Sequence, residues 1–229
     1  MSLLKSTFAS FLISLFLVNF SYAQEPTSLD ILKGIAQTPE IAKFFEGTFN
    51  HLGIIIDESG EKITLHHEGD KITIEEGLDP NKVDFVLPLI LKDIGNVVKF
   101  SSDGKFDEEE ATHVAKVFFT PFTRETMKNP VMSENRKRKA AGIEDLIHVQ
   151  LLFPDGSVAA SHTLIYAAKQ WVVLDELVGV PRRTFKMKAG PALEYQRKVF
   201  HAIEMDSKKE WIKFVKWYKT WRNEHSTKS

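Results

Sequence analysis

The chain has no cysteine among its 229 residues. This absence excludes disulfide bonds, thiolate metal sites, covalent haem attachment and a cysteine nucleophile. It also excludes the acylated cysteine that anchors a bacterial lipoprotein, so we expect the mature protein to be free in its compartment.

An excess of charge of one sign is also lacking. Lysine and arginine number 30 against 31 aspartate and glutamate residues, which gives a formal net charge of −1 at pH 7. Nucleic-acid-binding domains carry clustered basic charge, so this balance argues against that class of partner. The sequence contains no G-x-S-x-G elbow, no glycine-rich phosphate loop and no dinucleotide fingerprint. We predict no nucleic-acid partner and no cofactor.

Only one stretch is long and apolar. It covers residues 8–20 and follows a single charge at Lys5. Ser21 and Ala23 then place small residues at the third and first positions before a cut ahead of Gln24. The stretch is shorter than the roughly 20 residues that cross a bilayer. We therefore predict a signal peptide over residues 1–23 and export, either to a Gram-negative periplasm or by secretion; the lack of disulfides favours the periplasm.

The first half of the remaining chain combines short helices with short strands. Ser28 and the pair Thr38-Pro39 are typical of helix starts. Three β-branched segments separated by turn residues predict an antiparallel meander over residues 53–57, 62–66 and 71–75. A fourth apolar segment, with Pro88 at its end or edge, is expected to be a strand over residues 83–91. The fold class indicated is α+β, an antiparallel sheet covered by helices.

Asp107 and Glu110 have the spacing of an acidic capping box, which predicts the start of a helix that Pro121 is expected to end. Residues 129–142 contain Pro130 and a basic run and are expected to be a linker. Beyond it, alternating patterns predict strands over residues 147–153, 158–167 and 171–177. A long amphipathic C-terminal helix is then expected to start near Ala192. The predicted organisation is an α+β domain over residues 24–128 and a β-rich part over residues 143–229, which is either separate or continuous with the first sheet.

Residues 45–119 resemble the sterol carrier protein 2 (SCP2-like) lipid-binding domain. The likeness rests on an amphipathic helix followed by the patterns G-I-I-I-D, S-G-E-K-I-T-L, G-D-K-I-T-I-E-E-G, D-F-V-L-P-L and K-D-I-G-N-V-V. The resemblance implies a non-enzymatic carrier with a tunnel for a fatty acyl chain, a sterol or a related molecule. The candidate pocket residues are Phe44, Phe45, Leu91, Val98, Phe118 and Phe119. The same side chains would equally make a solid core, and both readings stay open.

A calcium-modulated or partner-binding module is one alternative. Residues 99–110 are similar to the second half of an EF-hand loop, with candidate ligands Asp103, Asp107 and Glu110. Lys99 and Ser101 stand where the loop needs oxygen-rich ligands, and a turn followed by a capping box explains the same residues. We therefore predict no metal site and keep calcium binding as the alternative.

An enzyme with a histidine-based site is a second alternative. His148 and His162 lie on neighbouring predicted strands, and this alternative requires them to face each other, with His113 approaching across the sheet. Ser161 beside His162 lacks the surroundings that a serine nucleophile requires. This hypothesis needs the histidine side chains to line one pocket.

The C-terminal helix has two opposed faces. Trp211, Trp217 and Trp221 share an aromatic face, while Lys213 and Lys216 lie on a basic face. Interfacial tryptophans beside lysines fit peripheral contact with an anionic membrane. The aromatic face would also fit packing on the second group of strands. The function that the sequence favours is an exported lipid-binding or carrier protein.

Overall fold

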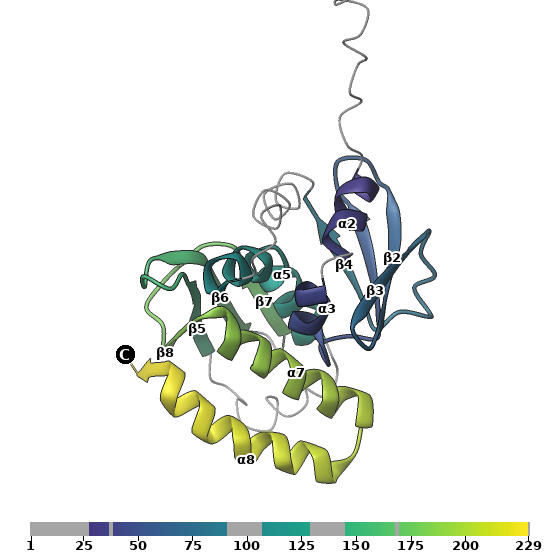
Figure 1. The fold of residues 1–229 in the computed structure, drawn as a ribbon. Helices are drawn as coiled ribbons and strands as arrows, with labels where there is room; N and C mark the ends of the chain where they lie inside the picture. The colour runs from purple at the N-terminus through teal and green to yellow at the C-terminus, as the bar shows by residue number, and fades with distance from the viewer. Residues whose placement is uncertain (1–27, 37–38, 91–106, 129–144, 168–169, 229) are drawn as a thin grey trace, which may run out of the picture.

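The computed structural model describes residues 28–36, 39–90, 107–128, 145–167 and 170–228 (Figure 1). The predicted signal peptide, the predicted linker and all of the EF-hand-like segment before Asp107 lie outside these residues, as do the pocket candidates Leu91 and Val98. Within the described part, no helix is long and apolar enough to cross a membrane.

The first half forms a four-stranded sheet with strand order β3-β2-β1-β4, called the first sheet here. The predicted short helices, the meander and the fourth strand are all present. Their bounds are α2 (Ser28–Ala36), α3 (Pro39–Phe45), β1 (His51–Ile56), β2 (Lys62–Glu68), β3 (Lys71–Glu76) and β4 (Phe85–Leu89). β4 is an edge strand, which tolerates Pro88 because one side needs no hydrogen bonds.

The second half forms a five-stranded sheet with strand order β7-β6-β5-β8-β9, called the second sheet here. Its strands are β5 (Asp145–Leu152), β6 (Val158–Ala167), β7 (Gln170–Leu174), β8 (Arg183–Met187) and β9 (Ser226–Lys228). The sequence predicted the first three strands and missed β8 and β9, which are short. The α+β class is confirmed, and most neighbouring strands pair antiparallel as expected, but each sheet is mixed because it contains one parallel pair. β4 runs parallel to β1, and β8 runs parallel to β5.

The two sheets share one topology. Each is a three-stranded meander whose first strand then receives a parallel fourth strand on its other side. A threonine on the middle strand marks the same corner in both: Thr64 Oγ1 donates to Gly77 O at 2.8 Å, and Thr163 Oγ1 donates to Glu176 O at 2.7 Å. Each sheet also has a backbone hydrogen bond of 2.8 Å just before its parallel strand. In the first sheet Asp84 N donates to His51 O, and in the second Arg182 N donates to Leu146 O. Inner-face positions therefore correspond one to one between the sheets.

Helix α5 (Glu108–Lys128) begins at the predicted capping box. Asp107 Oδ1 accepts hydrogen bonds from the amides of Glu109 and Glu110 at 2.9 and 3.0 Å, and Glu110 Oε2 accepts from the Asp107 amide at 2.9 Å. The expected end at Pro121 is wrong, because the helix continues for two more turns. Phe122 and Thr126 are buried in those turns, and their packing offsets the hydrogen bond that proline removes.

The expected single C-terminal helix is two helices, α7 (Ala189–Met205) and α8 (Lys208–His225). Asp206 breaks the helix with a φ of 35° in the left-handed region. Ser207 then caps α8, because its Oγ accepts a hydrogen bond from the Glu210 amide at 3.3 Å. The break turns α8 back along α7, so the two helices lie side by side at the lower edge of the molecule in Figure 1.

α5 packs against both sheets. Val114, Phe118 and Phe122 belong to the core of the first sheet, while Phe119 and Met127 pack into the core of the second. α7 makes a further link between the halves, because the Arg197 guanidinium donates to Phe44 O and Glu46 O at 2.7 Å each.

Because α5 packs into the cores of both sheets, its capping box should contribute to the stability of the whole described part of the chain. We expect Asp107→Ala to lower the free energy of unfolding by about 1 kcal/mol, since an N-cap acceptor is lost. Urea unfolding measures the change. Glu109→Ala is the control, because its exposed side chain takes no part in the cap. Equal stability of Asp107→Ala and the wild type would contradict this role.

Candidate functional site

A cavity of about 290 Å³ lies between the inner face of the second sheet and helices α5, α7 and α8. This volume is close to the lower end of the roughly 300–1,000 Å³ range of small-molecule pockets. Most of its lining is apolar and comes from every one of these elements, including Phe119, Phe122, Met127, Ile147, Val149, Leu164, Phe185, Met187, Leu193, Phe214, Tyr218 and Trp221. The cavity thus has an apolar floor of strands and an aromatic cover of helices.

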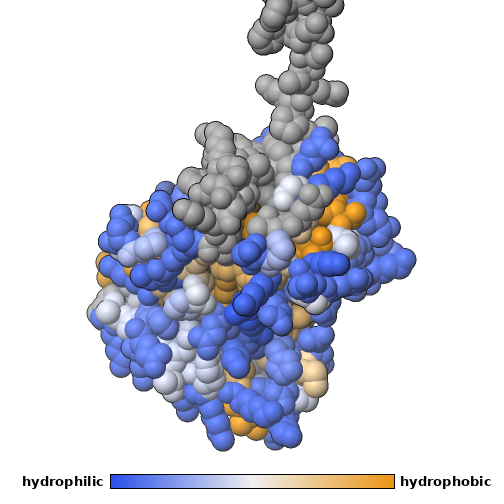
Figure 2. Space-filling model, in the orientation of Figure 1, coloured by the Kyte–Doolittle hydropathy of each residue, from blue (hydrophilic) through white to orange (hydrophobic). Residues whose placement is uncertain are grey.

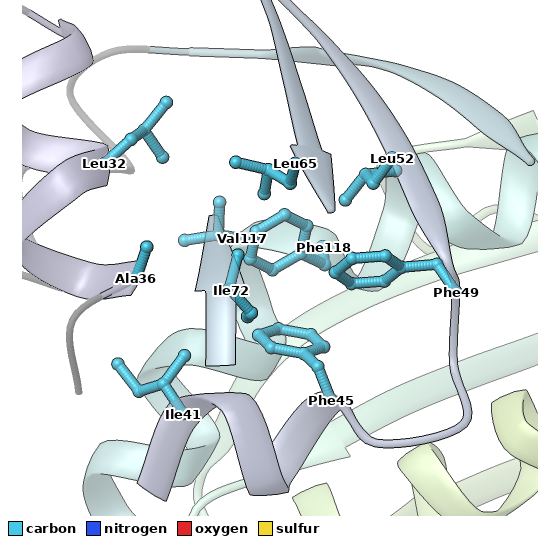
Figure 3. Close-up of a pocket in the computed structure, with 10 residues that line it drawn as sticks. All are labelled: Leu32, Ala36, Ile41, Phe45, Phe49, Leu52, Leu65, Ile72, Val117 and Phe118. Carbon is cyan, nitrogen blue, oxygen red and sulfur yellow. The ribbon is translucent and has the colours of Figure 1, made fainter. Parts of the chain in front are cut away.

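The first sheet encloses a much smaller space. Its void measures about 30 Å³ and lies among side chains of α2, α3, α5 and the strands (Figure 3). Figure 3 shows Phe45, Phe49 and Phe118 pointing into the same space, which leaves little of it open. All ten lining residues are apolar. The first sheet therefore has an essentially filled core, whereas the second has a cavity.

The shared topology allows the two inner faces to be compared residue by residue. Six positions are apolar in both sheets: Leu52, Ile54, Ile56, Leu65, Leu87 and Leu89 in the first, and Ile147, Val149, Leu151, Leu164, Phe185 and Met187 in the second. Two positions differ in kind. His162 stands where the first sheet has Ile63, and Arg183 stands where it has Phe85. The polar residues of the cavity floor are thus local departures from an otherwise apolar pattern.

His162 is fully buried on β6, with its ring 4.7 Å from the Phe119 ring between centroids. Neither ring nitrogen has a hydrogen-bond partner among the described residues. Burial lowers the pKa of His162 to about 4, and Asp175 opposes this only partly because Arg124 pairs with that carboxylate at 2.7 Å. The imidazole is therefore neutral near pH 7, with one nitrogen a donor and the other an acceptor.

Other lining residues also carry buried polar atoms that find no hydrogen-bond partner in the described part of the chain. They are Thr126 Oγ1, Gln196 Nε2, Trp211 Nε1, Trp221 Nε1 and Arg222 Nε. A buried polar group without a partner costs about 1–3 kcal/mol, and native proteins contain few of them. These atoms are concentrated around one cavity, where a molecule held inside would have them within reach.

Arginines supply the charge of the cavity wall. Arg182, Arg183 and Arg222 line it, and no aspartate, glutamate or lysine is among its described lining residues. Arg183 Nη1 donates to Ser226 Oγ at 2.6 Å, and Ser226 Oγ donates to Arg222 O at 2.5 Å, which joins β8, β9 and the end of α8. One end of the cavity is therefore basic.

The structure gathers only some of the predicted pocket residues. Phe45, Phe118 and Phe119 line the larger cavity, while Phe44 packs in the neighbouring core without lining it. Most of the lining comes from β5, β6, β8, α7 and α8, which the sequence did not predict as a pocket. The one available signal was His162, a polar residue at an inward position of an alternating strand.

His148 and His162 do not face each other, so the arrangement that the histidine-based alternative requires is wrong. His162 pairs with Val149 across the strands, which places His148 on the opposite face of the sheet, where its Nε2 lies 2.9 Å from Val178 O. His113 lies on α5 with its ring 5.0 Å from the Phe153 ring. Ser161 is next to His162 in sequence and therefore points to the other side of the sheet. The histidines thus do not line one pocket.

The aromatic face of α8 points inward. Trp221 is buried against Phe185 and Tyr195, and Trp211 and Trp217 are half-buried. Lys213 and Lys216 are exposed on the outer side. Figure 2 shows hydrophobic surface over α8 between hydrophilic side chains, and Ile212 and Val215 are exposed on this helix. Membrane contact through α8 stays a prediction.

The candidate calcium ligands Asp107 and Glu110 are engaged in the capping box. Asp103 lies outside the described residues. No group of three or more histidine, aspartate or glutamate side chains that could hold a metal ion occurs in the described ranges.

No family model, no curated protein and no solved structure matches the chain. The SCP2-like resemblance therefore stays a prediction.

The buried His162 should make stability depend on pH. Its folded pKa of about 4 lies below the 6.5 of an unfolded histidine, so the unfolded chain binds the proton more readily between these values. Stability should fall as the pH falls through this interval, by about 3 kcal/mol in total from this residue. His162→Ile, which installs the residue found at the matching position of the first sheet, should remove that part of the pH dependence.

Urea unfolding of both proteins between pH 7 and pH 4 measures this effect. His201→Gln is the control, because His201 lies on the surface of α7. Parallel stability curves for the wild type and His162→Ile would show that His162 does not titrate as a buried group.

Proposed function

We propose that this protein binds a lipid or a similar apolar small molecule in the cavity of the second sheet. The observation that carries the proposal is the cavity itself: a space of about 290 Å³ with an apolar floor and with buried polar groups that find no partner in the described chain. Apolar cavities with a few convergent polar groups are the usual form of small-molecule sites. Export, as the sequence predicts, would make the protein a carrier or binder outside the cytoplasm.

The lining of the cavity supports a ligand. Most of its side chains are apolar and the remainder are a few polar groups, three of them arginines. A small apolar molecule with a polar end matches this combination.

Neither sequence-based alternative gains a comparable observation. A calcium-modulated module would need oxygen ligands that converge, and in the described part Asp107 and Glu110 serve the helix cap instead. A histidine-based enzyme would need a second titratable group beside His162, and His148 points to the other face of the sheet. Both remain predictions of the sequence alone.

A cavity-filling substitution tests the proposal. Val149 lies on the cavity floor in β5, the central strand of the second sheet, so the larger side chain of Val149→Phe should occupy part of the cavity. We expect the affinity for the neutral apolar dye Nile red to fall by about tenfold or more, equal to about 1.4 kcal/mol. Fluorescence titration of the purified protein measures the affinity, and thermal unfolding checks that the variant is folded.

Val172→Phe is the matched control. It makes the same change on β7 of the same sheet, at a position that is 46 % exposed and does not line the cavity. Its affinity for the dye should equal that of the wild type. Equal dye affinity in Val149→Phe and Val172→Phe, with both variants folded, would place the dye elsewhere and refute the site.

A further inference from the structure

The buried polar atoms around the cavity are mainly hydrogen-bond donors. The indole N–H groups of Trp211 and Trp221, the Gln196 amide nitrogen and Arg222 Nε can only donate. Thr126 Oγ1 and the neutral His162 ring can donate or accept. None of these partnerless atoms in the described lining is an acceptor only. A molecule that satisfies them must therefore bring acceptor atoms.

The charge of the lining points the same way. Its only formally charged side chains, within the described residues, are Arg182, Arg183 and Arg222. The whole chain carries a formal net charge of −1, so this grouping of arginines does not simply reflect a basic protein. A buried cationic ligand such as an amine would meet like charge and few acceptors. An anion would meet both donors and cations.

The polar groups also divide the cavity. Arg183 on β8 and Arg222 at the end of α8 are joined through Ser226, while His162 lies two strands away on β6. Two strand spacings amount to about 10 Å. Ile147 and Val149 on β5 lie between these two ends of the floor, and Phe185 on β8 pairs with Val149. A ligand with an anionic head at the arginine end would lay its apolar body across this floor toward His162.

We propose that the ligand is an anionic amphiphile, an apolar body with a carboxylate or phosphate head whose oxygens accept hydrogen bonds at the Arg222 end of the cavity. This inference rests on the proposed function and adds the chemical class of the ligand. Arg222 Nε and Trp221 Nε1 donate to the head group, and guanidinium–oxyanion pairing is among the strong hydrogen bonds of proteins. Neutral His162 tolerates a further oxygen at the other end.

Four compounds with the same twelve-carbon chain test the inference: dodecanoate, dodecyl phosphate, dodecanol and dodecylamine. Trp171, Trp211 and Trp221 line the cavity, so intrinsic tryptophan fluorescence reports binding without a label. Titrations of the wild-type protein are run below the micelle concentration or, for dodecanol, the solubility limit of each compound. We expect at least one anion to bind about tenfold or more tighter than dodecanol, since a hydrogen bond to a charged group is gained. Dodecylamine should bind most weakly.

Arg222→Met and Lys219→Met separate the cavity from surface charge. Both remove one positive charge from α8, but Lys219 is exposed and does not line the cavity. Arg222→Met should lower the affinity for the preferred anion by about tenfold while leaving that for dodecanol within about twofold. Lys219→Met should change neither. Thermal unfolding confirms that each variant is folded.

The outcomes distinguish the proposed ligand class from the proposed binding site. If dodecanol or dodecylamine binds the wild type as tightly as both anions, the ligand class is wrong and the apolar site stands. If Arg222→Met and Lys219→Met weaken anion binding equally, the head group is held by surface charge and the inference also fails. If none of the four compounds binds, the proposed function fails with it.

Discussion

The packing of α5 between the two sheets is the contact on which the rest of the structure depends. Phe118 on one side of this helix meets Phe45, with ring centroids 5.0 Å apart, and belongs to the core of the first sheet. Phe119, the next residue, turns to the second sheet and contacts His162. One helix therefore closes the first core and forms a wall of the cavity.

The two sheets provide an internal comparison that explains the site. They share strand order and register, and six matched inner positions are apolar in both. Aromatic and aliphatic side chains fill the core of the first sheet and leave only a small void. The second replaces an isoleucine with His162 and a phenylalanine with Arg183, and its cover of α7 and α8 leaves a cavity above them. Polar residues and open space occur together, as expected of a site for an amphiphile.

Local sequence patterns predicted much of the fold. The alternation of residues such as Ile63 and Leu65 with polar neighbours identified the meander strands, and the Asp107–Glu110 spacing identified the start of α5. The parallel pairing of β4 and β8 was missed, because strand direction depends on tertiary contacts that no local pattern encodes. The continuation of α5 through Pro121 was missed for a similar reason, since buried residues beyond the proline offset a local penalty.

The candidate site was less predictable than the fold. β8 places Arg183 at an inward position, which breaks the alternation that would have identified the strand. The break at Asp206 interrupts a helical pattern that continues on both sides, so α7 and α8 were predicted as one helix and their cover over the second sheet could not be foreseen. Phe45, Phe118 and Phe119 were predicted as pocket residues because they are aromatic and apolar. The groups that give the cavity its donor character come from helix turns and strand positions that only the tertiary structure brings together.

If the cavity of the second sheet holds an amphiphile whose oxygens accept hydrogen bonds, this molecule should remain bound during native purification. Mass spectrometry of an organic extract, made from the protein purified under native conditions from the cells that produce it naturally, detects it. We expect an amphiphilic acid in near-stoichiometric amount, released when the protein is unfolded. A folded protein whose extract contains no apolar molecule above the level of a blank purification would refute ligand binding in this cavity.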